Sequence, residues 1–381
     1  MIGIVNVQWF DNPGAVLLCY ALQQTVGRLR PGEQVEIINY TCGGKIEKAG
    51  IFHKVAKVPA KVRTKVLGRK RIAGVKYGLL LRQRHERYEE FRKEYLNRTA
   101  GFRDVSSPIL DTPYTHCIVG SDVVWKPDIA KVIDAKVYFL QFADKSVKKI
   151  AYAASIGTDD DAILQPLTSL YKKLTEDFDA ISMREASGVA FMQPLTKKQI
   201  KEVADPVFLL DKEDYRRMIP VTGPMEGRYI YLYLLSPNGE AVDYAIGLAK
   251  KKALKILFDV HTDVNFKLWE EMQDIFEASV AAGPAEFLSN IYYADYVVTD
   301  SFHGTSFSLI FQKEFYTYPR ISNGVDISTR MKNLLEKVDL RNRYCIPEKG
   351  EAAEKINYCM VDGKIAEMRK DALEFLKGVL E

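Results

Sequence analysis

The residues with the clearest potential for chemistry lie at positions 300–305, where Asp-Ser-Phe-His-Gly-Thr interrupts an apolar stretch. The residues before this run favour a strand, and the apolar spacing after it favours a buried helix. At such a junction the free N–H groups and the positive dipole end of the helix favour an anion. His303 is the group in this run whose charge can change near neutral pH. We therefore interpret it as the centre of a candidate anion-binding site.

The neighbours of His303 suit either of two roles. Hydroxyls at Ser301 and Thr305 can bind a ligand, and Gly304 lets a ligand approach the backbone closely. Alternatively, Asp300 or Ser301 only caps the helix, and His303 makes a structural hydrogen bond. The stretch by itself leaves both interpretations open.

Further strand-like runs end in small or charged side chains where helices begin. These side chains are Ser121 and Asp122, Ser155, Arg184, and Asp205. In an open parallel sheet such strand ends share one edge, and that edge carries the site. Arg184 is the strongest candidate, because a lone guanidinium at this edge usually has an anionic partner. Asp122 and Asp205 could instead be turn or cap residues.

A similar junction lies near the start of the chain. Residues 2–7 form a strand-like run, a turn-rich segment follows, and a helix-like run begins at Gly14. Asn12 and Gly14 therefore lie where a first strand would pass into a helix. The junction lacks the full G-x-G-x-x-G spacing, so it supports a dinucleotide site only weakly.

The order of these patterns predicts an α/β protein with two doubly wound, Rossmann-like domains. A chain of 381 residues exceeds one ordinary core, and its apolar content of 47% permits two. A charged segment rich in Pro and Gly at 206–227 separates two series of alternating strands and helices. We expect domains at 1–210, with a basic excursion at 54–98, and at 211–360, followed by a helix at 361–381 that could pack back on the first domain.

Composition restricts the compartment and the cofactors. The cysteines are odd in number and never in C-x-x-C spacing, which argues against a disulfide framework and a zinc site; they are Cys19, Cys42, Cys117, Cys345 and Cys359. The amino terminus lacks the features of a signal peptide, and no stretch reaches the length of a membrane span. We expect a cytoplasmic protein that needs no metal, with peripheral membrane contact left open.

Positive charge is concentrated in one segment. Residues 54–84 contain eleven Lys or Arg and no Asp or Glu, so that the rest of a chain of net charge +4 carries −7. One interpretation is contact with anionic lipid or with a pyrophosphate-bearing lipid substrate at the inner face of the membrane. The other is a solvated excursion whose helix packs on its own domain. Nucleic acid is a weaker alternative, because no series of stacking aromatic residues accompanies the charge.

A series of motifs in order along most of the chain resembles the polysaccharide pyruvyl transferase family. They are GAVLLCYALQ at 14–23, NY at 39–40, IVGSDVVWKP at 118–127, YFLQF at 138–142, KKIAYAASIG at 148–157, ISMREASG at 181–188, DPVFLL at 205–210 and TDSFHGTSFSLIFQKEF at 299–315. The resemblance implies a GT-B-like fold, with the two domains facing each other across a cleft. It also implies transfer of the enolpyruvyl unit of phosphoenolpyruvate to a sugar.

Site residues follow from this resemblance position by position. His303 matches the family histidine at a helix start, and Arg184 matches the arginine at a strand end; both would hold the phosphoenolpyruvate anion. Active members often carry an Arg two places before the histidine, where this chain has Ser301. The loops DNPGAVL and GSDVVW also differ from the common family forms, which leaves the subfamily and the acceptor open.

The expected chemistry needs cations and groups that move protons. Phosphoenolpyruvate is a trianion near neutral pH, and a helix N-terminus offers only about half a charge, so fixed cations are required as well. Ketal formation also needs proton transfers, for which His303, Asp122 and Asp300 are the candidates. The expected substrate-binding set is Arg184, Ser301, Gly304, Thr305, Asn12, Gly14, Ser121 and Ser155. No cofactor is expected besides the donor substrate.

Three hypotheses for function remain. The first is a pyruvyltransferase that forms a ketal on an exopolysaccharide or capsule glycan, or on its lipid-linked precursor. The second is a GT-B glycosyltransferase that uses a nucleotide sugar, because a helix N-terminus serves a diphosphate equally well. The third is a non-catalytic glycan- or lipid-binding relative, given Ser301. The ordered motifs favour the first.

Overall fold

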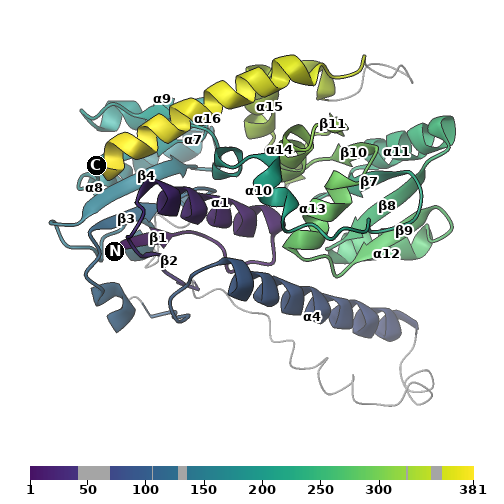
Figure 1. Ribbon diagram of the computed structural model, residues 1–381, viewed down its shortest axis with the longest axis horizontal. Helices are drawn as coiled ribbons and strands as arrows, with labels where there is room; N and C mark the ends of the chain where they lie inside the picture. The colour runs from purple at the N-terminus through teal and green to yellow at the C-terminus, as the bar shows by residue number, and fades with distance from the viewer. Residues whose placement is uncertain (42–68, 105, 128–134, 323–324, 345–353) are drawn as a thin grey trace.

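The computed structural model describes residues 1–41, 69–104, 106–127, 135–322, 325–344 and 354–381. In this part of the chain the strands form two larger parallel sheets and one short hairpin (Figure 1). Helices flank both larger sheets, which is how parallel strands bury both of their faces. The predicted α/β class, with two Rossmann-like units, is confirmed.

The first sheet has the order β2-β1-β3-β4-β5-β6, counted over the described strands. Its strands are β1 (Ile2–Val5), β2 (Val35–Ile37), β3 (His116–Val119), β4 (Lys148–Ala154), β5 (Ala180–Met183) and β6 (Lys201–Glu202). The helices of this unit are α1 (Pro13–Leu29), α4 (Arg69–Tyr95), α6 (Ala135–Tyr138), α7 (Asp161–Leu164), α8 (Thr168–Thr175), α9 (Ala186–Met192) and α10 (Lys212–Arg216). The carboxyl ends of the parallel strands share one edge, as the sequence predicted.

The second sheet has the order β11-β10-β7-β8-β9 within the same described residues. Its strands are β7 (Tyr229–Tyr233), β8 (Lys255–Val260), β9 (Phe276–Val280), β10 (Tyr296–Thr299) and β11 (Glu314–Thr317), and the hairpin pairs β12 (Ile321–Ser322) with β13 (Val325–Asp326). The helices are α11 (Gly239–Lys252), α12 (Asp263–Glu271), α13 (Pro284–Tyr292), α14 (Phe302–Ile310), α15 (Thr329–Lys337) and α16 (Tyr358–Leu380). Strand β9 lies at the sheet edge and is mostly half-exposed. Its sequence therefore lacks the continuous apolar run by which a strand is predicted.

Helix α16 crosses from the second unit to the first. Near its start, the Asp362 carboxylate accepts a hydrogen bond of 2.6 Å from Gln312, at the end of α14. Farther along, Arg369 donates to the carbonyls of Phe208 and Leu210 at 2.7 and 2.9 Å. Phe375 then lies 6.3 Å from the Tyr152 ring, on β4 of the first sheet. The helix therefore spans both units on one side of the molecule (Figure 1).

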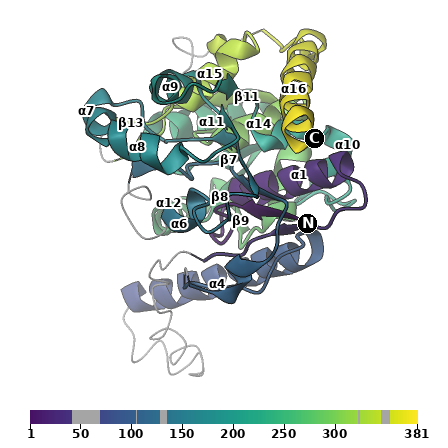
Figure 2. The same ribbon diagram turned by 90° about the vertical axis from the view of Figure 1, so that its left-hand side faces the viewer.

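Helix α4 makes a similar bridge on the opposite side of the molecule, as Figure 2 shows. At its carboxyl end, the buried Arg92 donates to the Gln8 carbonyl at 3.0 Å in the loop after β1. Toward its amino end, the Tyr77 ring lies 5.2 Å from Phe266 of α12. Between these points Arg84 is buried, with Nη1 3.8 Å from the Asp259 carboxylate of β8. Helix α4 therefore packs against both units.

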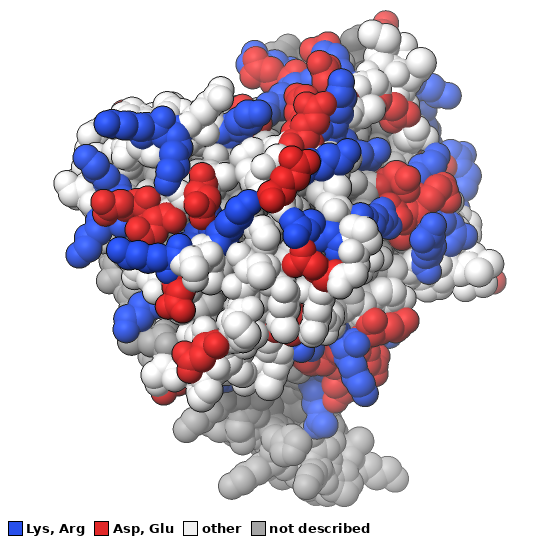
Figure 3. Space-filling model, turned by 60° about the vertical axis from the view of Figure 1, so that its left-hand side comes forward, with Lys and Arg blue, Asp and Glu red and all other residues white. Residues whose placement is uncertain are grey.

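The packing of α4 bears on the prediction that residues 54–84 contact lipid. Residues 54–68 of the basic excursion lie outside the described residues, and Arg84 is buried against the second unit and is not free to meet a lipid surface. Basic and acidic side chains are interspersed on the face drawn in Figure 3. Among the described helices, none combines the length and the apolarity that crossing a membrane requires.

We expect Arg84→Leu to lower the free energy of unfolding by roughly 3 kcal/mol, because it removes the guanidinium that faces the buried Asp259 carboxylate. Chemical denaturation monitored by circular dichroism measures this loss. Arg82→Leu is the control on the same helix, since Arg82 is exposed and pairs with the exposed Glu86 at 2.9 Å. Equal stability of the two variants would show that α4 does not hold the second unit through Arg84.

Candidate functional site

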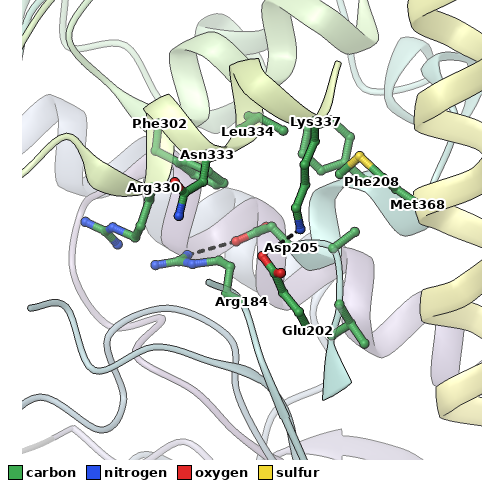
Figure 4. A pocket seen from close by; sticks show the side chains of 12 residues that line it. Arg184, Glu202, Asp205, Phe208, Phe302, Arg330, Asn333, Leu334, Lys337 and Met368 are labelled. Carbon is green, nitrogen blue, oxygen red and sulfur yellow. Dashed lines mark hydrogen bonds and ion pairs between the residues drawn. The ribbon is translucent and has the colours of Figure 1, made fainter. Parts of the chain in front are cut away.

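Arg184 and His303, the strongest candidates from the sequence, both lie close to one oxygen atom of the Asp205 carboxylate. Asp205 follows β6 and is completely buried. Its Oδ1 accepts from the Val207 amide at 3.1 Å, and its Oδ2 accepts from Arg184 Nη1 at 2.9 Å (Figure 4). His303 Nε2, from the start of α14, lies 3.9 Å from the same Oδ2. The structure therefore brings Arg184 and His303 together where the carboxyl ends of the two sheets meet. We call this region between the units the seam.

Arg184 has several anionic partners within the protein. Besides Asp205, its guanidinium lies 3.4 Å from Asp122 and 3.7 Å from Glu185, and it stacks 5.1 Å from the Phe302 ring. Burial opposes its charge, but these carboxylates more than offset burial and raise its pKa. The anionic partners of Arg184 in this structure are therefore carboxylates of the protein, which neighbouring strand ends supply.

Asp122 links Arg184 to a cation that the sequence analysis missed. The Asp122 backbone has a left-handed φ of 72°, and its carbonyl accepts from the Ser155 amide at 3.0 Å. Its carboxylate lies 3.4 Å from Arg184 and 3.8 Å from Arg330 of α15. Burial raises the pKa of Asp122, but Arg184, His303 and Arg330 outweigh burial and lower it. Asp122 is therefore ionised and shared by the two guanidiniums.

Arg330 is an unfavourably placed charge in this structure. Its side chain is only 18% exposed, and burial together with the nearby Arg184 lowers its pKa to about 10. It also lies in the first turn of α15, where the helix dipole disfavours a cation. A basic residue in the first turn of a helix was the available sequence signal. Cations held against such costs are characteristic of sites that receive an anion.

His303 depends on Gly14 for its position. A Cβ atom at Gly14, in the first turn of α1, would lie 2.0 Å from His303 Nδ1, so only glycine leaves room for the ring. Burial lowers the pKa of His303, although Asp205 and Asp122 oppose this shift. Its buried Nε2 has no hydrogen-bond partner among the described residues. His303 is therefore a neutral imidazole near pH 7 with one unused nitrogen.

Other predicted residues of the 300–305 run support the fold. Asp300 accepts from the Leu235 and Ser236 amides at 2.6 and 2.9 Å, so it faces the loop after β7. Ser301 caps α14 by accepting from the Gly304 amide at 3.2 Å. Thr305 bonds the Ser301 carbonyl at 3.0 Å. These contacts favour the structural interpretation that the sequence left open for this run, and they point Asp300 away from Arg184.

Gly304 and the small residues of the first unit have similarly local contacts. Gly304 packs against Thr299, since an added Cβ would lie 2.5 Å from Thr299 Oγ1. Asn12 accepts from the Ala15 amide at 3.1 Å and caps α1. Ser121 donates to the Ala153 carbonyl at 2.7 Å, and Ser155 donates to Glu185 at 2.7 Å. Ser155 therefore reaches the Arg184 cluster through Glu185, while Ser121 Oγ lies 3.5 Å from Asp205.

A cavity of about 20 Å³ lies beside this cluster, lined by Arg184 and Asp205 from the first unit and by Phe302, Arg330 and Lys337 from the second (Figure 4). That space suits one water molecule. Lys337 crosses the seam to Glu202 at 2.6 Å and closes one side. Over the described residues, no group of three or more His, Cys, Asp or Glu side chains could hold a metal ion.

The fold and the site define a two-unit α/β protein of GT-B-like architecture, with charged groups where the strand ends of both sheets meet. The family model for polysaccharide pyruvyl transferase matches residues 12–320. The chain therefore belongs to the polysaccharide pyruvyl transferase family, as its motifs indicated, and is a transferase.

Solved structures with a similar chain course are distant in sequence. UDP-GlcNAc 2-epimerase from Neisseria meningitidis, bound to UDP-GlcNAc, is 8% identical with a TM-score of 0.47, covering 98% of this chain and 93% of that one. The Methanocaldococcus jannaschii UDP-GlcNAc 2-epimerase is 12% identical with a TM-score of 0.43, covering 97% and 92%. The E. coli heptosyltransferase WaaC is 13% identical with a TM-score of 0.39, covering 88% and 99%. No curated protein sequence matches the chain.

We predict that Gly14→Ala lowers the free energy of unfolding by about 1–3 kcal/mol, because the new methyl group overlaps the His303 ring and forces α1 or the ring to move. Gly27→Ala is the matched control on the same helix: its Cβ would meet no atom within 4 Å, and helix propensity should stabilise it by about 0.5–1 kcal/mol. Thermal unfolding of both variants distinguishes the effects. A stable Gly14→Ala variant with His303 unmoved would contradict this packing.

Acidification should destabilise the protein partly through His303. Its pKa in the folded state lies below its ordinary value of 6.5, so the unfolded state binds more protons between those two values. The stability associated with a neutral His303 is therefore complete above pH 6.5 and is lost as the pH falls through the folded pKa. His303→Gln should show a shallower loss of free energy of unfolding between pH 7 and pH 5 than the wild type. Parallel curves for the two proteins would contradict a buried neutral imidazole.

Proposed function

We propose that this transferase moves the enolpyruvyl unit of phosphoenolpyruvate onto two hydroxyls of one sugar, forming a pyruvate ketal on a surface polysaccharide or its lipid-linked precursor. The observation that carries the proposal is the convergence of Arg184, Arg330 and His303, from both units, on the carboxylates of Asp205 and Asp122. Family membership supports the class of reaction. Charge and geometry support the donor.

The anionic donor would take the place of Asp122 between the guanidiniums. Asp122 lies 3.4 Å from Arg184 and 3.8 Å from Arg330, whereas Asp205 holds Arg184 at 2.9 Å and is completely buried. Asp122 is therefore the weaker partner and the one that a phosphate or carboxylate group displaces. A bound anion also relieves the repulsion between Arg184 and Arg330.

Arg330 offers an explanation for the departure at position 301. Ser301 caps α14 and carries no charge, so it cannot replace the arginine that family members often have there. Arg330 reaches the same cluster from α15 and supplies a guanidinium from the second unit. The donor would thus meet one arginine from each unit, together with His303.

Donor entry would require the seam to open. A cavity of about 20 Å³ holds one water, whereas small-molecule sites commonly enclose about 300 Å³ or more. The Lys337–Glu202 ion pair, at 2.6 Å, is exposed enough to separate without leaving a buried charge. Movement of α15 relative to β6 would admit the donor between Arg184 and Arg330, as in hinge closure around ligands.

The reaction then balances without an external reactant. The methylene carbon of the donor takes a proton, and one sugar hydroxyl bonds to the adjacent carbon. A second hydroxyl on the same sugar displaces the phosphate, which leaves as hydrogen phosphate. His303 and the released Asp122 are the groups at this point that can move protons, each worth about a hundredfold or more in rate. Peripheral lipid contact through residues 54–84 would present a lipid-linked acceptor, with Arg84 excluded from that contact by its burial.

The purified protein should bind phosphoenolpyruvate and release inorganic phosphate from it only when a sugar acceptor is present. Thermal shift measures binding, and a phosphate assay with a panel of methyl hexopyranosides and polyprenyl-linked saccharides measures turnover. Stabilisation by UDP-, GDP- or CMP-sugars, but not by phosphoenolpyruvate, would overturn the proposal in favour of a glycosyltransferase.

In the same assays Arg330→Met should bind phosphoenolpyruvate roughly 10- to 100-fold more weakly, because it loses a hydrogen-bonded charge. Its melting temperature without ligand should not fall, since the substitution removes a buried cation that Arg184 repels. Lys332→Met is the control on the same helix, because Lys332 pairs with Asp326 at 2.7 Å and is half exposed. Unchanged affinity in Arg330→Met would remove Arg330 from the donor site.

A further inference from the structure

A second imidazole lies at the carboxyl edge of the second sheet. His261 Nδ1 lies 2.8 Å from Asp259 Oδ1, and the Tyr231 hydroxyl donates to Asp259 Oδ2 at 2.8 Å. An ionised carboxylate only accepts, so the Nδ1 of a neutral His261 carries the proton and Nε2 carries the lone pair. The His261 side chain is 7% exposed, and its Nε2 has no hydrogen-bond partner among the described residues.

His261 and His303 lie on the same edge. Strand β7 separates β8, which ends just before His261, from β10, which leads to His303. Tyr233, the last residue of β7, lies 5.0 Å from the His261 ring. The two imidazoles therefore flank the end of one strand, at the edge where open α/β sheets bind their ligands.

The segment after β1, which runs to Gly14 in the first turn of α1, contacts His303 and is linked to His261 through Arg84 and Asp259. Its end at Gly14 contacts His303, and its Asp11 carbonyl accepts from Arg84 at 3.3 Å. Arg84 in turn lies 3.8 Å from Asp259, the partner of His261. Residues 11–14 therefore join the His303 contact to the Arg84–Asp259 pair. Arg84 Nη1 is also buried without a hydrogen-bond partner in the described part of the chain.

The same loop also presents a flat apolar surface. The Trp9 and Phe10 rings stack with centroids 3.7 Å apart, and Phe10 is 50% exposed. An exposed aromatic face beside hydrogen-bonding groups suits the apolar face of a sugar ring, whose hydroxyls then point toward the polar groups. A site made of cationic side chains without an aromatic face would instead suit an anion.

We propose that His261 is the general base for the acceptor hydroxyl, that Asp259 is its positioning residue, and that the acceptor sugar lies along residues 9–14 between His261 and His303. This inference rests on the proposed function. The acceptor proton passes to His261 Nε2 while the acceptor oxygen forms its bond to the central carbon of the enolpyruvyl unit. The methylene carbon takes a proton from the acid on the donor side, His303 or Asp122. When the second hydroxyl displaces the phosphate, the proton on His261 leaves with the phosphate, and the proton of the second hydroxyl restores the donor-side acid.

His261→Asn tests the base, because an asparagine amide can still donate to Asp259 and only the basic nitrogen is lost. Phosphate release from phosphoenolpyruvate with the methyl hexopyranoside panel should fall at least about a hundredfold in kcat, while phosphoenolpyruvate affinity by thermal shift stays at the wild-type value. His116→Asn is the matched control. It removes another buried imidazole with an unpartnered Nε2, but at the amino end of β3.

Two further measurements separate a base from a structural histidine. Exogenous imidazole should restore turnover to His261→Gly, which a lost packing contact would not allow. Asp259→Asn should lower kcat, because the carboxylate that holds the proton on His261 Nδ1, and so leaves Nε2 free as the base, is lost. The effects of Asp259→Asn and His261→Asn on kcat should not add, because both remove the same base.

The outcomes distinguish this inference from the proposed function. A wild-type protein that neither binds phosphoenolpyruvate nor releases phosphate with any acceptor overturns the proposed function, and this inference with it. An active wild type with an equally active His261→Asn overturns the base assignment alone. Loss of phosphoenolpyruvate affinity in His261→Asn overturns the separation of acceptor and donor sides.

Discussion

The buried carboxylate of Asp205 is the interaction on which the rest of the site depends. A buried charge is costly unless it is paired, and Asp205 finds its pair in Arg184, from the neighbouring strand end. His303 approaches the same oxygen from the other unit, at 3.9 Å. Asp205 therefore holds the Arg184 guanidinium close to the helix start of the second unit.

Two helices keep the units close enough for that meeting. Helix α4 packs on the loop after β1 and on α12 and β8, while α16 runs from α14 to the first sheet on the other side. Apolar packing between α1 and α13 continues the core from one unit to the other. The seam is consequently narrow beside Arg184, where the Lys337–Glu202 ion pair closes one side of the cavity.

Two parts of the site differ in charge, and each suits one of the two proposed substrates. At one end, Arg184 and Arg330 share Asp122, which makes a region suited to a strongly anionic group. On the second sheet, Asp259 orients the His261 imidazole, whose Nε2 has no hydrogen-bond partner among the described residues. The reaction proposed above joins an anionic donor to a sugar hydroxyl and needs both environments, and the strand order of the second sheet places His261 and His303 on one edge.

The sequence by itself determined the alternation of strands and helices, the family, and the strand ends that carry Arg184 and His303, because hydrophobic periodicity and turn chemistry act over a few residues. It could not decide between ligand binding and capping at Ser301, nor the orientation of Asp300, since both depend on which backbone amides lie within reach. Arg330, His261 and the burial of Arg84 emerged only in three dimensions. The partners of Arg330 and Arg84, Asp122 and Asp259, lie about 210 and about 175 residues away in the chain, so the packing of the two units brings them together. His261 pairs with Asp259 two residues earlier, but strand order places it near His303.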